Sequence, residues 1–182
     1  NLYDYCTASN TKNPKNLNDS GNYYTVELFD IDNDGWLDLF LGSKGSLLII
    51  KNKEGVFDRQ IGFNIQTDNT LQFLDIDFFD FDEDGIKEIL VMNNKHTYNG
   101  YYLKLYKFNF ESYSDITGSY FDETQYDGEN SWIKWLHIFD YDRDGDLDIL
   151  ADGLFGDLNK NNGNGIIYWK NTGEKFVRTS NF

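Results

Sequence analysis

The chain has 182 residues, enough for one domain or two small ones, and its 40% hydrophobic and 18% aromatic residues suffice for a packed core. No apolar run approaches the ~20 residues of a membrane-spanning helix, so we expect no insertion into a membrane. Sixteen basic and 31 acidic side chains give a formal net charge of −15, which argues against a nucleic-acid partner and favours cations.

The N-terminal segment, residues 1–22, has room for one or two strands, as in Leu2–Cys6, but not for a four-stranded sheet. We interpret it as the strand or strands of an adjacent sheet. The whole composition favours strands over helices, because aromatic residues are abundant and alanine is scarce.

The first strand pattern comes next along the chain. Val26 and Leu28 alternate with Glu27, which predicts a strand with one buried face. An acidic loop follows, and residues 39–41 then open a second apolar strand. A third strand is predicted over residues 46–50, directly after a glycine. A tight turn after residue 50 leads to a short fourth strand.

This unit occurs three times. The acidic loops share the pattern D-x-D-x-D-G-x-x-[D/E], and they are Asp30–Asp38, Asp80–Glu88 and Asp140–Asp148. Apolar residues flank each loop in the same register, and the turn Lys51–Phe57 recurs as Lys170–Phe176. A four-stranded antiparallel sheet repeated at this period is typical of a β-propeller blade. We predict an all-β fold, a propeller or partial propeller of about three blades. A single propeller domain, or a fragment of one, would span residues 1–182, with repeats at approximately 23–70, 71–130 and 131–182.

These units resemble FG-GAP/VCBS repeats, the calcium-bearing blades of integrin α-subunit propellers and of many secreted bacterial proteins. The resemblance covers residues 23–182 and rests on the acidic loops, the apolar flanks and the turn that occurs twice. The second copy departs in two ways: it lacks the Lys-Asn turn, and Glu88 replaces the last aspartate. The resemblance implies a calcium-bearing propeller. Since calcium outside cells fills modest sites that cytosolic calcium would leave empty, we expect the chain to lie outside the cell or on its surface.

Alternate side chains of a tight loop can turn their carboxylates toward one centre, as Ca²⁺ requires with its six to eight oxygen ligands. The glycine of each loop adopts a backbone conformation that a side chain would resist. One main-chain carbonyl per loop, from Trp36, Ile86 and Asp146, is a further expected ligand. The expected carboxylate ligands are Asp30, Asp32, Asp34 and Asp38, then Asp80, Asp82, Asp84 and Glu88, then Asp140, Asp142, Asp144 and Asp148.

We therefore predict about three structural Ca²⁺ ions. An EF-hand is rejected, because its twelfth position needs a glutamate and the residues there are Leu41, Val91 and Ala151. Magnesium is a weaker candidate, because it prefers few carboxylates, and zinc lacks its nitrogen and sulfur ligands.

No catalytic constellation is evident, so we predict that the chain is not an enzyme. His137 stands in the same register as Glu27 and Asp77, a polar strand position, and His96 lies in a turn. No nucleophile elbow, phosphate-binding glycine loop or zinc signature is present.

The face opposite the acidic loops is the expected recognition surface, because the copies differ most in the connections there. Aromatic side chains beside short amides and carboxylates suit a sugar ring, and they suit a protein partner equally well. The candidate residues are Tyr98, Tyr113, Tyr126, Trp132, Asp157 and Asn159.

Three hypotheses about function stay open at this point. The first is extracellular recognition of a glycan or a protein, as in adhesion. The second is a purely structural role, as blades of a larger propeller or assembly. The third is an accessory or catalytic part of a polysaccharide-active enzyme. Since propellers close with four to eight blades, we expect further blades from a longer chain or from another subunit.

Overall fold

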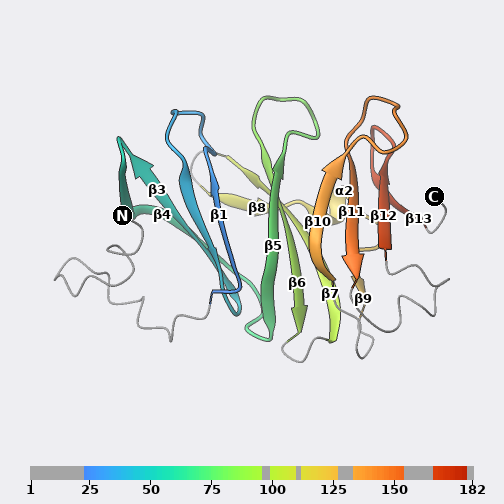
Figure 1. Ribbon diagram of the computed structural model, residues 1–182, viewed down its shortest axis with the longest axis horizontal. Coiled ribbons are helices and arrows are strands. Elements are labelled where there is room, and N and C mark those ends of the chain that lie inside the picture. Colours follow the sequence, from blue (N-terminus) through green and yellow to red (C-terminus); the bar gives the residue numbers. More distant parts are fainter. Residues whose placement is uncertain (1–22, 96–98, 110–111, 127–132, 154–165, 180–182) are drawn as a thin grey trace.

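The protein is described by a computed structural model, which places residues 23–95, 99–109, 112–126, 133–153 and 166–179. These residues form three antiparallel sheets that stand side by side (Figure 1). The first sheet has the order β1-β2-β3-β4. Its strands are β1 (Thr25–Phe29), β2 (Asp38–Gly42), β3 (Ser46–Lys53) and β4 (Val56–Gln66).

The second and third sheets repeat this order. The second consists of β5 (Leu71–Phe79), β6 (Glu88–Lys95), β7 (Asn99–Phe108) and β8 (Tyr113–Asp115). The third consists of β10 (Ile133–Phe139), β11 (Asp148–Gly153), β12 (Ile166–Asn171) and β13 (Phe176–Thr179). The all-β class and the three antiparallel four-stranded sheets are thus confirmed.

The second sheet carries two additions that the sequence patterns do not predict. A single helical turn, α2 (Thr117–Tyr120), follows β8, and the two-residue strand β9 (Gln125–Tyr126) pairs with β7. In the first sheet, β4 is eleven residues long, whereas the sequence pattern predicts a short fourth strand. No helix in the described part of the chain has the length and hydrophobicity to cross a bilayer.

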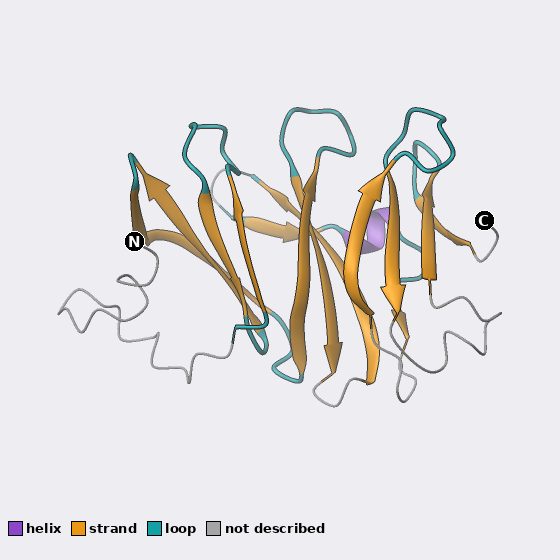
Figure 2. Ribbon diagram, viewed as in Figure 1, coloured by secondary structure: helices purple, strands orange, loops and turns teal. Residues whose placement is uncertain are grey.

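The first two strands of each sheet pair in the same register around the acidic loop. Phe29 faces Asp38 across the first hairpin, Phe79 faces Glu88 across the second, and Phe139 faces Asp148 across the third. Each loop therefore closes an equivalent hairpin. The three loops lie along the same edge of the molecule, the upper edge in Figure 2.

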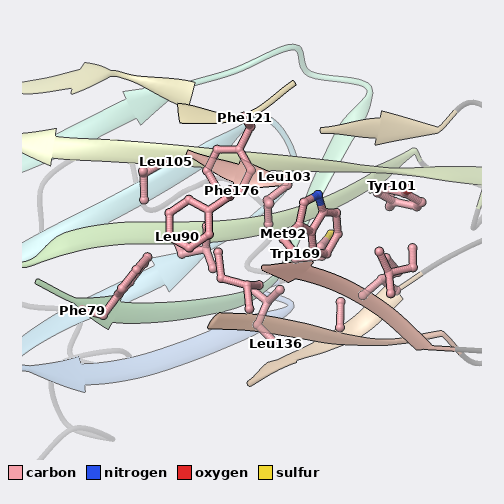
Figure 3. Close-up of a cluster of buried hydrophobic side chains, with 14 residues drawn as sticks. Phe79, Leu90, Met92, Tyr101, Leu103, Leu105, Phe121, Leu136, Trp169 and Phe176 are labelled. Carbon is pink, nitrogen blue, oxygen red and sulfur yellow. The ribbon is translucent and has the colours of Figure 1, made fainter. Parts of the chain in front are cut away.

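Apolar side chains from neighbouring sheets form the core between them. Between the first and second sheets, the rings of Phe29 and Phe78 stack with centroids 4.2 Å apart. Between the second and third sheets, Phe176 stacks on Phe121 at 4.8 Å, above Leu90, Met92 and other buried residues (Figure 3). Burial of a large apolar side chain stabilises the folded state by roughly 1.5–3 kcal/mol.

On the two outer faces of the arc, the apolar side chains of the first strands are exposed. Val26 is 48% exposed, whereas Ile76 and Leu136, in the same register, are each 5% exposed. Conversely, Phe139 is 39% exposed, whereas its counterpart Phe79 is 2% exposed. The expected burial of Val26 and Leu28 is therefore wrong for the described residues, because no other sheet among them packs on that side of β1. The described residues form an open arc, and no closed ring is present among them.

Candidate metal centres

Two residues in each acidic loop adopt the left-handed backbone conformation. Gly35, Gly85 and Gly145 have φ values of 89°, 86° and 100°, as their place in the motif predicts. The residue two positions earlier is also left-handed, and this was not anticipated. These residues are Asn33, Glu83 and Arg143, with φ of 57°, 57° and 63°. Since a side chain resists this conformation, the shared geometry of the loops overrides local preference.

Each loop is built around its first aspartate. The carboxylate of Asp30 accepts hydrogen bonds from the main-chain N–H of Asp34 at 3.1 Å and of Gly35 at 2.9 Å. Asp80 accepts from Gly85 at 2.9 Å, and Asp140 makes both equivalent contacts in the third loop. The first carboxylate therefore both folds the loop and faces its interior.

The last acid of each loop is fully buried at the start of the second strand. Asp148 accepts the N–H of Tyr141 at 3.1 Å and the N–H of Asn171 at 2.8 Å. Asp38 makes the same pair of contacts in the first sheet. Burial raises the pKa of Asp38, although Lys51 and the main-chain donors oppose this shift. Burial likewise raises the pKa of Glu88. A cation nearby would favour the ionised form of these carboxyl groups.

Three carboxylates converge in each loop, with oxygen atoms that all lie within 4.8 Å of one another. The groups are Asp30, Asp32 and Asp34; Asp80, Asp82 and Glu88; and Asp140, Asp142 and Asp148. The other predicted carboxylates, Asp38, Asp84 and Asp144, belong to the same loops but stand outside these tight groups.

The residue after each loop glycine donates its main-chain N–H to a carboxylate of the same loop. Trp36 and Ile86 donate their N–H to the third aspartate of the loop at 2.8 Å, and Asp146 does so at 3.1 Å. These contacts draw the loop tight around the carboxylates. That the carbonyls of these three residues bind metal stays a prediction.

The chemistry of these groups fits a hard divalent cation. All the converging atoms are carboxylate oxygens, the ligands that Ca²⁺ prefers. Asp32 Oδ1 and Asp80 Oδ1 are buried and have no hydrogen-bond partner among the described residues. A buried oxygen without a donor is costly, and a metal ion would satisfy it.

A lysine near the end of the third strand reaches into each loop. Lys51, Lys107 and Lys170 place their ammonium groups against the loop carboxylates. Burial acts to lower the pKa of Lys51, but the hydrogen bonds to Asp32 and Asp38 outweigh it and the pKa is raised. The sequence patterns include Lys51 and Lys170 in the repeated turn but assign no contact with the acids to any of the three lysines.

The asparagine of the repeated turn also has a role that the sequence does not reveal. The side-chain amide of Asn52 donates to the carbonyl of Leu37 at 2.9 Å, and Asn171 donates to Leu147 at 3.2 Å. The turn therefore holds the end of the acidic loop. Phe108 takes this place in the second sheet and packs against Tyr113 instead.

The expected recognition residues are described only in part. Tyr98, Trp132, Asp157 and Asn159 lie outside the described residues. Tyr126 lies in β9, paired with Tyr101 of β7, and its side chain is not described.

The remaining candidate, Tyr113, is not on the expected face. Its ring packs between Phe63 of β4 and Phe108 of β7, with centroids at 5.3 and 4.8 Å. Burial raises the pKa of Tyr113, and the negative charges of Asp38 and Asp32 raise it further. It therefore stands near the first acidic loop. The physical reason is that β7 ends at the loop edge, so β8 begins there.

Comparison with known families supports the repeat assignment. Residues 30–91 match the model of a family described as FG-GAP-like repeat. This segment begins at the first acidic residue of the first loop, includes the whole second loop and ends in β6. Neither the curated proteins nor the solved structures gave a match. The prediction of FG-GAP repeats is thus confirmed, and residues 30–91 of this chain form an FG-GAP-like repeat.

Proposed function

We propose that the chain is a calcium-stabilised, propeller-type module that acts outside the cell. The observation that carries this proposal is the threefold recurrence of three carboxylates within 4.8 Å at one edge of the fold. Two carboxylates this close repel each other by about 1 kcal/mol even in bulk water. A divalent cation would remove this repulsion.

The residues that would hold the ion are the carboxylates of each loop. In the first loop these are Asp30, Asp32 and Asp34, with Asp38 at the start of β2. When bound, the ion would supply positive charge and a link between the loop and the second strand, without taking part in catalysis. Extracellular modules bind Ca²⁺ at about 10⁻⁴–10⁻³ M, which agrees with the expected placement outside the cell.

Calcium titration of the metal-free chain tests the proposal by isothermal calorimetry. We expect one site per acidic loop, and Asp142→Asn should remove or weaken only the site in the third loop. Asp68→Asn is a matched control, because Asp68 is exposed outside the loops and its contact with the N–H of Thr70 survives in an asparagine. Absence of binding heat, or equal loss of binding in the control, would contradict the proposal.

We further propose recognition of a glycan or protein through the edge opposite the acidic loops. What supports this is the sequence of the connections at that edge, which differ most among the copies. Binding to a glycan array or to a candidate protein should be lost in Tyr98→Ala and Trp132→Ala. It should persist in Trp36→Ala, a control on an exposed aromatic residue of the loop edge. Binding that ignores Tyr98 and Trp132 would count against this edge.

A second candidate function, architectural blades of a larger propeller, is favoured by the outer faces of the arc. Val26 and Phe139 are exposed at positions that a neighbouring sheet buries elsewhere in the chain. The occupant proposed for each face is a further blade of the same kind, because the existing sheet contacts define where it would pack.

Hydroxyl-radical footprinting separates this candidate from the first. In the isolated chain, Phe139 and Tyr141 should be oxidised, whereas Phe79 should be protected. In the intact parent assembly, the architectural role predicts protection of all three residues. Equal oxidation of Phe139 and Tyr141 in both samples would contradict it.

A further inference from the structure

Three lysines occupy equivalent positions beside the acidic loops. Strand pairing aligns Ile50, Tyr106 and Trp169 opposite the first apolar residue of the second strand in each sheet. The next residue is lysine in all three sheets: Lys51, Lys107 and Lys170. The equivalence is therefore structural, although the distance along the chain from loop to lysine differs in each copy.

The ammonium groups lie against the oxygens that a metal would use. Lys51 Nζ is 2.7 Å from Asp32 Oδ2 and 2.5 Å from Asp38 Oδ2. Lys107 Nζ is 2.7 Å from both Asp82 Oδ2 and Asp84 Oδ2. The same nitrogen lies 3.1 Å from Glu88 Oε1.

In the third loop, Lys170 forms ion pairs with Asp142 and with Asp144, the latter at 3.1 Å. The loops differ in how firmly the lysine is held. The Lys51 side chain is 9% exposed and reaches the fully buried Asp38, whereas the Lys170 side chain is 38% exposed. Burial makes an ion pair harder to replace, because its partners are less screened by water.

A metal ion and an ammonium group cannot both contact the same carboxylate oxygen without strong repulsion. Calcium entry thus requires the lysine to swing away, which its flexible four-carbon stem permits. We propose that this third-strand lysine is a built-in competitor of calcium. It neutralises the loop when no ion is bound, and it lowers the calcium affinity. The inference rests on the proposed calcium function.

The competition is graded along the arc. The first loop has the most buried lysine and four acidic residues. The third loop has the most exposed lysine, and because Arg143 offsets one of its five acidic residues, its net charge equals that of the first loop. The third loop therefore binds calcium most tightly and the first most weakly, so the loops fill in a set order as calcium rises.

Removal of the lysine charge tests the inference. Lys51→Met and Lys170→Met keep an unbranched apolar stem but remove the ammonium group. In calorimetry, Lys51→Met should raise the affinity of the weakest site by about tenfold, and Lys170→Met should raise the tightest by a smaller factor. Both variants should melt at a lower temperature than the wild type in the presence of a chelator.

Lys104→Met is the matched control. It makes the same change in net charge from the same strand as Lys107, but Lys104 pairs with Asp115, 2.9 Å away and outside the loops. It should alter neither calcium affinity nor the metal-free melting temperature more than slightly. If Lys51→Met does not fold, Lys107→Met provides the same test, because its side chain is 25% exposed.

The outcomes separate the two proposals. If the wild type binds calcium and the loop-lysine variants bind no more tightly than Lys104→Met, the competitor role is overturned while the calcium function stands. If neither the wild type nor any variant binds calcium, the proposed function itself fails, and the competitor role fails with it. If only the loop-lysine variants bind, the lysine holds the site in the wild type, which supports the inference.

Discussion

Alanine substitution at Phe79 and Phe139 compares one strand position in two surroundings. Both residues end the first strand of their sheet and face the last acid of the loop across the hairpin. Phe79 is 2% exposed, and its ring lies 6.0 Å from the rings of both Phe81 and Phe176. Phe139 lies on the outer face of the third sheet with one aromatic neighbour, Tyr141, at 5.9 Å.

The two alanine substitutions should lower the free energy of unfolding by amounts that differ several-fold. Truncation of a buried phenylalanine removes its transfer free energy and leaves a cavity, so Phe79→Ala should lower the free energy of unfolding by about 3–5 kcal/mol. Phe139 buries less area and leaves no enclosed cavity, so its truncation should cost about 1 kcal/mol or less.

Urea denaturation at low protein concentration, in a chelator, measures both values. The midpoints should shift while the dependence on urea stays constant, which shows that stability and not the denatured state has changed. Equal losses at the two positions would refute the account of an open outer face in the isolated chain. A loss at Phe139 that grows with protein concentration would point instead to a second chain covering that face.

Three further predictions concern a pair of glycines and two carboxyl groups. Gly45→Ala should lower the free energy of unfolding by at least about 2 kcal/mol, because φ is 70° and a Cβ would lie 2.6 Å from the main chain of the facing turn. Gly35→Ala should lower it by about 1–2 kcal/mol, because the left-handed φ is the only obstacle there. Equal losses of stability at the two glycines would contradict the predicted clash at Gly45. Burial raises the pKa of Asp77, so the stability this carboxyl contributes is present below the ordinary pKa of aspartate and lost as pH rises through the folded-state value. Asp77→Asn, which can still accept the N–H of Phe78, should therefore be more stable than the wild type at neutral pH by a few tenths to about 1 kcal/mol, and denaturation across pH should show this gap closing, not widening, on acidification. Asp148→Ala should lower metal-free stability by about 1–3 kcal/mol, since two main-chain N–H groups lose their acceptor; an unchanged urea midpoint in chelator would exclude that role.

The sequence is sufficient to predict the sheets and the acidic loops, because both are specified by local patterns. Alternation around Glu27, Asp77 and His137 predicts the first strands, and spacing within nine residues brings the carboxylates together. Local spacing cannot reveal the lysines. Lys51 and Lys170 follow the last loop acid at different distances, and only strand register shows that they are equivalent.

Burial at the ends of the arc is also beyond local pattern. Val26 and Ile76 are both apolar residues in the same register, yet their exposure differs because only one of them has a neighbouring sheet. Tyr113 is the opposite case, a residue expected at the surface that is packed between sheets. Its place in a variable connection suggests a surface residue, whereas the end of β7 directs it into the space between two sheets.

A crystal structure of the chain grown with calcium tests the central claim most directly, through anomalous difference density at the acidic edge. The account predicts an ion in each of the three loops, bound by the carboxylates around Asp32, Asp82 and Asp142, with the third-strand lysines turned away. Loops that contain no ion at saturating calcium, with the ammonium groups still on the carboxylates, would contradict it.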